Sequence, residues 1–168
     1  IDKPKFSIMH SRIFQITKEQ VARENYLNED TLVQGDGSHI DYCAEISAKE
    51  REQSIVCLVD DVLPKGMFTR LGANILRYNG GMEQWKEQAI ANIHEKLAAL
   101  TPEKYFCGSR FYDLKETVVN PFDTGFLFYM DTAGEQSVSE TSYDFMFYVS
   151  GLEEGTLLYI GGVIDYHF

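Results

Sequence analysis

TLLYIGGVIDYHF (residues 156–168) is the last of four segments near the C-terminal end that each predict a β-strand. The other three are YFCGSRFYDLKE (105–116), GFLFYMD (125–131) and YDFMFYVSG (143–151). All four are rich in aromatic and aliphatic residues, and turn-forming stretches separate them. Strands that follow one another without intervening helices favour antiparallel pairing. Within the last segment, Gly161-Gly162 predicts a bulge or bend in the strand.

The preceding part of the chain combines strands with helices. Apolar periodicity predicts two strands, over residues 6–16 and 40–46, and a continuously apolar run predicts a third, central strand over residues 54–63. Helical spacing and capping residues predict three helices, over residues 18–27, 64–78 and 82–100. The turn Asn79-Gly80-Gly81 joins the last two helices, so they are expected to form an antiparallel pair. The predicted fold class is therefore α+β, a mainly antiparallel sheet of about six to seven strands with an antiparallel helical pair packed on one face.

Length and composition indicate a soluble globular chain with a single domain, residues 1–168. Hydrophobic residues make up 44% and charged residues 24% of the sequence. No apolar run reaches the ~20 residues that a membrane helix needs, so no membrane association is expected. The three cysteines include no CxxC pair, which argues against a disulfide framework and for a reducing, cytoplasmic location. The chain starts at Ile1 rather than Met, so a removed leader stays compatible with the sequence.

Negative charge is concentrated at the C-terminal end. The formal net charge is -11, and residues 116–168 contain nine Asp or Glu residues but no Lys or Arg. The same segment holds 11 of the 22 aromatic residues. An electrostatic field of this sign repels nucleic-acid phosphates and attracts basic protein surfaces. We therefore expect a protein partner with a basic surface and no direct nucleic-acid binding, whereas the oligomeric state stays open.

The first functional hypothesis is a non-catalytic interaction domain without a cofactor. Acidic residues surrounding exposed Tyr and Phe side chains form the kind of surface that binds a basic protein. By analogy of charge and size alone, inhibitor, immunity or antirestriction roles fit such a domain. The residues predicted to bind are Tyr129, Asp131, Glu135, Glu140, Tyr143 and Asp144.

Two alternatives stay open at this point. The second hypothesis is a metal-assisted hydrolase that uses a divalent transition metal, because alternate residues on two predicted strands are of types that bind such metals. The residues concerned are His39, Asp41, Cys43, Asp165 and His167. They would converge only if the two strands were neighbours. The third hypothesis is a ligand pocket between the sheet and the helical pair, lined by Tyr78 and Trp85.

Overall fold

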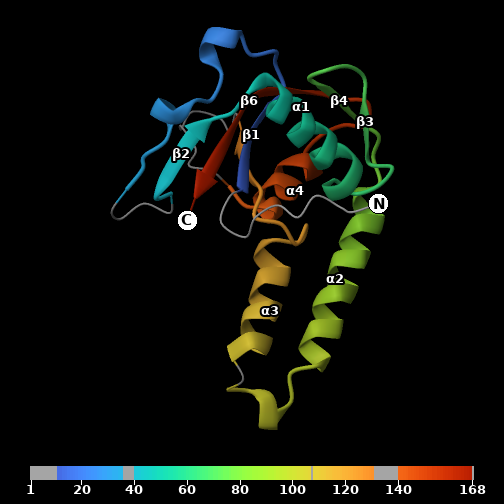
Figure 1. Ribbon diagram of the computed structural model, residues 1–168. Coiled ribbons are helices and arrows are strands. Elements are labelled where there is room, and N and C mark those ends of the chain that lie inside the picture. The colour runs from blue at the N-terminus through green and yellow to red at the C-terminus, as the bar shows by residue number, and fades with distance from the viewer. Residues whose placement is uncertain (1–10, 36–39, 107, 131–139, 168) are drawn as a thin grey trace, which may run out of the picture.

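A computed structural model describes residues 11–35, 40–106, 108–130 and 140–167 (Figure 1). The described part of the chain has an α+β fold with a six-stranded sheet and four α-helices. The strands are β1 (Ser11–Thr17), β2 (Tyr42–Glu45), β3 (Phe68–Arg70), β4 (Ile75–Tyr78), β5 (Leu127–Met130) and β6 (Leu157–His167). The α-helices are α1 (Ala48–Cys57), α2 (Met82–Ala98), α3 (Gly108–Val119) and α4 (Ser142–Ser150).

The long strand β6 is the centre of the sheet. The strand order is β3-β4-β6-β1-β5, and β2 pairs with β6 outside this path. Because β1 runs along one edge of β6, the other edge is shared by β4, near Leu158, and β2, near Tyr166. The pair β1–β5 is parallel, and the other pairs are antiparallel. The sheet is thus mixed but mostly antiparallel.

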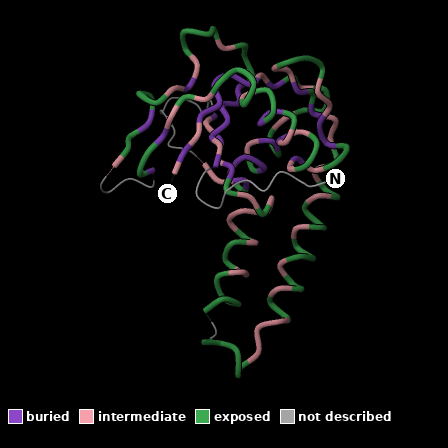
Figure 2. Tube along the Cα trace, viewed as in Figure 1, coloured by how far each residue is buried: buried purple, intermediate pink, exposed green. Residues whose placement is uncertain are grey.

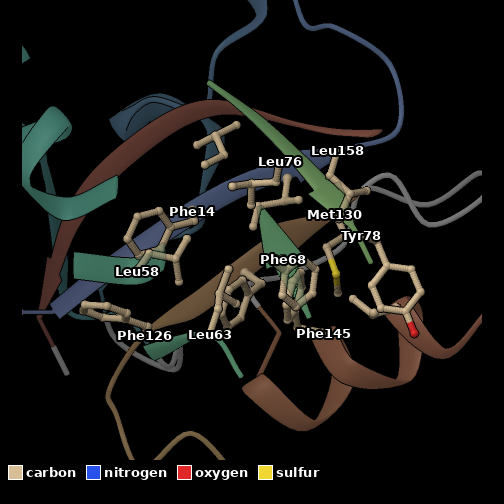
Figure 3. Close-up of a cluster of buried hydrophobic side chains, with 14 of the residues drawn as sticks. Phe14, Leu58, Leu63, Phe68, Leu76, Tyr78, Phe126, Met130, Phe145 and Leu158 are labelled. Atoms are coloured by element: carbon tan, nitrogen blue, oxygen red, sulfur yellow. The ribbon is translucent and has the colours of Figure 1, made fainter. Parts of the chain in front are cut away.

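Two apolar clusters lie on opposite faces of this sheet. On one face, α1 and α4 contribute Ile55, Phe145 and Val149 to the main core (Figure 3), in which the rings of Phe128 and Phe145 stack with centroids 4.3 Å apart. On the other face, irregular chain brings Leu27, Leu32 and Ile40 onto the sheet against Ile13, Ile164 and Tyr166. The sheet therefore has helices on one side and irregular chain on the other.

A bulge in β6 at Gly161-Gly162 confirms the sequence prediction. The register shifts by three residues on β6, from Val163 to Ile160, against two on β1. The side chain of Gln15 fits into this bulge. Its Oε1 accepts hydrogen bonds from the backbone N–H groups of Gly162 (2.8 Å) and Leu27 (2.9 Å). A Cβ atom at Gly162 would lie 2.2 Å from the carbonyl oxygen of Leu27, so only glycine fits at this position.

Two predicted strands are helices in the structure. The segment predicted as a strand over 54–63 belongs to α1 and to a π-helical turn, Leu58–Val62. The segment 143–151 forms α4. In both places a capping box starts the helix: Ser47 precedes α1 and pairs with Glu50 in its first turn, and Thr141 precedes α4 and pairs with Asp144 in its first turn. The continuous apolar run over 54–63 and the alternating aromatic residues over 143–151 were thus weaker signals than the capping boxes.

The predicted helical pair over 64–100 is also wrong in its first member. Residues 68–78 form the β3–β4 hairpin rather than a helix, and the segment 105–116 falls largely in α3 rather than in a strand. The segment predicted as a helix over 18–27 contains only a short 3-10 turn, Arg23–Asn25. The predictions of β2, α2, β5 and β6 are confirmed, and that of β1 is confirmed from Ser11 onward, because residues 6–10 lie outside the described residues.

Helices α2 and α3 form an antiparallel hairpin that projects away from the body (Figures 1 and 2). Lys96 Nζ contacts both carboxylate oxygens of Asp113 at 2.9 Å, so these two residues lie at the same level of the hairpin. Every residue of both helices is described, and none of them is buried. The hairpin therefore does not cover the sheet, which is instead packed by α1 and α4.

Candidate functional site

Helix α4 presents two aromatic side chains to solvent. Its buried side places Phe145, Met146 and Val149 in the main core. Tyr143 and Phe147 lie one turn apart on the other side and are 52% and 73% exposed. The buried residues occupy one side of the helix, so the two aromatic side chains on the other side do not pack in the core. They belong to the segment 116–168, which contains no Lys or Arg.

The predicted acidic residues near this pair have different roles. The carboxylate of Asp144 accepts hydrogen bonds from the backbone N–H of Thr141 (3.0 Å) and from its Oγ1 (2.7 Å), so it caps α4. Glu140 precedes the cap, and its backbone pairs with that of Phe128 at 2.7 and 2.9 Å. Both acids are half-buried beside the exposed ring of Tyr143. They keep negative charge at the start of α4.

The remaining predicted binding residues do not join this group. Tyr129 is half-buried on β5 and packs against the second apolar cluster, on the side of the sheet opposite α4. Asp131 and Glu135 lie outside the described residues. The structure therefore brings together three of the six predicted residues, Glu140, Tyr143 and Asp144, and adds Phe147.

One cation already lies on α4. The ammonium group of Lys18, which directly follows β1, is 5.3 Å from the centroid of the Tyr148 ring. This distance is within the range of a cation–π interaction. The ring of Tyr148 is half-buried next to the exposed Phe147. The surface of α4 thus has the chemistry needed to hold a lysine side chain.

The predicted metal ligands lie on neighbouring strands but on different faces. The pairing of β2 with β6 places Cys43 opposite Tyr166, and Ala44 opposite Asp165. Residues directly opposite in an antiparallel pair share a face, so Cys43 and Asp165 point to opposite sides of the sheet. His167 alternates with Tyr166 and lies on the side of Asp165.

The environments of these residues also differ. Asp165 forms an ion pair with Arg12, and the Arg12 Nε donates a hydrogen bond to Ser54 Oγ (3.2 Å). Burial raises the pKa of the Cys43 thiol, which disfavours the thiolate that binds metals. Asp41 is exposed, and His39 lies outside the described residues. Within the described ranges, no three His, Cys, Asp or Glu side chains gather as a possible metal site.

A cavity lies near the predicted ligand pocket. Its volume is about 340 Å³, and it is lined by Met67, Asn79, Gly81 and Trp85 among others, between the β3–β4 hairpin and the start of α2. Trp85 thus lies at the wall of this cavity, whereas Tyr78 is buried in the main core and does not line it. The cavity is open to the surface rather than enclosed between the sheet and a helical pair.

The largest group of exposed apolar residues in the described part of the chain was not predicted from the sequence. On the α2–α3 hairpin, seven described side chains share this property: Ile90, Leu97, Tyr105, Phe106, Phe111, Tyr112 and Val118. Phe106 at the tip is 95% exposed. Because the segment 105–116 was predicted as a strand, its aromatic residues were assigned to a sheet. The spacing of seven residues between Phe111 and Val118 was the available helical signal.

Comparisons of the chain with protein-family models, with curated protein sequences and with solved structures find no match. In the described part of the chain, no helix has the length and apolar character to cross a membrane. The function must therefore be argued from the surfaces themselves.

Proposed function

We propose that the chain is a non-catalytic interaction domain that binds a protein with a basic surface through α4 and the acidic segment 131–144, which includes the first turn of this helix. The observation that carries the proposal is the exposed pair Tyr143 and Phe147, next to Glu140 and Asp144. Aromatic side chains supply much of the contact energy at protein interfaces, whereas acidic neighbours select a basic partner and speed its encounter.

Two further features support this assignment. Residues 116–168 contain no Lys or Arg, so the only positive charges near α4 come from other segments, such as Lys18 over the ring of Tyr148. A Lys or Arg side chain of a partner would find the same acceptors, an aromatic face and a carboxylate, on the exposed part of the helix. The body of the protein also carries most of the net charge, which favours long-range attraction of a basic partner.

Affinity capture with matched variants tests the proposal. The purified chain is immobilised and exposed to an extract of the cells that produce it, at low and at high salt. We expect Phe147→Ser to reduce the retained basic protein by about tenfold or more, because an aromatic contact at an interface centre contributes at least about 1.4 kcal/mol. Reversal of Glu135 and Glu140 to Lys is expected to weaken binding and to reduce its salt dependence.

Leu71→Ser is the control, because Leu71 is also exposed but lies in the loop after β3. This variant should retain the partner like the unaltered chain. Equal retention by Phe147→Ser, or a retained protein that is acidic and insensitive to salt, would contradict the proposal.

A further inference from the structure

The α2–α3 hairpin exposes apolar side chains in two rows. Ile90 and Leu97 lie seven residues apart on α2, and Phe111 and Val118 lie seven apart on α3. Residues with this spacing follow one line along a helix. Their exposed fractions range from 41% to 53%, so each side chain has about half of its surface available for a further contact.

Both rows lie on the same face of the hairpin. Leu97 follows Lys96, and Lys96 bonds Asp113 across the two helices. Val118 follows the half-buried Thr117, one turn after Asp113. Leu97 and Val118 each come one residue after a residue that faces the other helix. In two antiparallel right-handed helices, moving one residue along either chain turns toward the same side of the pair, so the two rows lie next to each other. The ion pair also places Leu97 near the level of Phe111.

The opposite face of the hairpin carries polar pairs together with the exposed ring of Tyr112. There, Gln88 Nε2 donates to Asn92 Oδ1 (2.9 Å) on α2, and Asn120 Nδ2 donates to Glu116 Oε2 (2.9 Å) at the end of α3. A hairpin that projects into solvent with two polar faces would need no partner. The first face carries the four apolar side chains with the exposed His94 and Lys115 between them, and an unequal distribution of apolar side chains is the pattern of helices that pack on other helices.

The hairpin and the rest of the chain differ in net charge, and this difference favours a second copy of the chain as the partner of the hairpin. Residues 82–119 contain six acidic and five basic residues, a net charge of -1, so the remaining residues carry -10. The hairpin would therefore attract a basic partner only weakly. A second copy of the same nearly neutral face meets no electrostatic barrier there, whereas two bodies placed side by side would repel.

The dimensions also suit a second copy. At 1.5 Å per residue, the 17 residues of α2 span about 25 Å, and two adjacent helices are about 20 Å wide. Each copy then offers a face of about 500 Å², and two such faces give about 1,000 Å², the size that a specific interface needs. Two hairpins packed face to face form a four-helix bundle.

We infer that this chain forms a two-fold dimer in which the Ile90–Leu97 and Phe111–Val118 rows of two copies pack into a four-helix bundle, with the acidic bodies at opposite ends. A two-fold axis places the same patch on both copies, which a single apolar face satisfies. The inference is independent of the proposed basic partner, because α4 and the 131–144 segment are not part of the interface.

Sedimentation equilibrium of the full chain tests the inference. We expect a species of twice the 19.2 kDa chain mass at micromolar concentration. Ile90→Asp with Leu97→Asp should raise the dissociation constant at least about 100-fold, because four unpaired carboxylates would enter an apolar interface. Gln88→Asp with Asn92→Asp adds the same charge to the polar face and should leave the dimer intact.

Circular dichroism of each variant establishes that the helices persist, and Phe111→Lys on the other helix should also give a monomer. A monomeric unaltered chain, or equal association of the two double variants, would overturn the inference. Small-angle X-ray scattering of the dimer tests the arrangement: an elongated particle is expected, and a compact particle with the bodies together would overturn it.

Discussion

Replacement of Gln15 by Met would remove one side chain that joins three segments. Gln15 is buried on β1, and its Oε1 accepts from the backbone N–H groups of Leu27 and Gly162, while its Nε2 donates to the carbonyl of Asn25 (3.2 Å). Methionine has a similar length but no comparable acceptor. Two buried N–H groups would lose their partner, at about 1–3 kcal/mol each, so the free energy of unfolding should fall by about 2–6 kcal/mol.

Urea unfolding followed by circular dichroism measures this change. Gln53→Met is the control, because Gln53 is exposed on α1, where methionine is a good helix former. The control should change the free energy of unfolding by less than about 0.5 kcal/mol. A loss below about 1 kcal/mol for Gln15→Met would refute the view that this side chain fastens the irregular segment 18–32 to the bulge in β6.

Three further outcomes follow from buried groups. Gly162→Ala should lower the free energy of unfolding by about 3 kcal/mol, because its Cβ would meet the Leu27 backbone; an unchanged urea midpoint would contradict this contact. Asp165→Asn should lower the free energy of unfolding by about 3 kcal/mol, because the half-buried Arg12 loses the carboxylate with which it pairs. A variant as stable as the unaltered chain would contradict this prediction. Burial raises the pKa of Tyr166 to about 12, above the value of about 10 for an unfolded tyrosine. Its contribution is therefore complete below pH 10 and is lost as the pH rises toward 12, so the stability difference from Tyr166→Phe should shrink by about 2 kcal/mol by pH 12; a constant difference between pH 9 and pH 12 would argue against this.

Alternation of residues with a period of two predicted those strands in which successive side chains point to opposite faces of the sheet. This held for β1, β2, β5 and β6, and the double glycine in β6 predicted its bulge. It failed for α4, since aromatic residues at consecutive positions contain both a period-two and a helical pattern. The capping residues Thr141 and Asp144 were the local signal that separates the two.

The helix predicted over residues 64–78 is wrong, because the apolar residues there have helical spacing but the chain forms the β3–β4 hairpin. Met67, Phe68 and Leu71 fit a helical stripe, but Gly66 has a φ of +83°, which a helix does not contain. The extended chain that follows pairs Phe68 with Tyr78. Because residues 64–78 do not form a helix, α2 pairs with α3 instead. The contacts between α2 and α3 cannot be predicted from the periodicity of either segment alone.

The candidate site was predictable only in part for the same reason. Tyr143 and Asp144 were selected from the acidic, aromatic composition of the C-terminal segment, which does not depend on secondary structure. The proposed face of α4 depends on helical geometry, which pairs Tyr143 with Phe147 and separates both from Tyr129. The register of β2 on β6 likewise decides that Cys43 and Asp165 lie on opposite faces.

Site-specific photo-cross-linking in the cells that produce the chain tests the interaction surface most directly. A benzophenone amino acid at position 147 is compared with the same residue at position 71, which is also exposed but lies in the loop between β3 and β4. The proposal predicts an adduct with a basic protein at position 147, absent at position 71 and diminished when Glu135 and Glu140 are reversed to Lys. Adducts that are equal at both positions, or that are unaffected by the reversal, would contradict it.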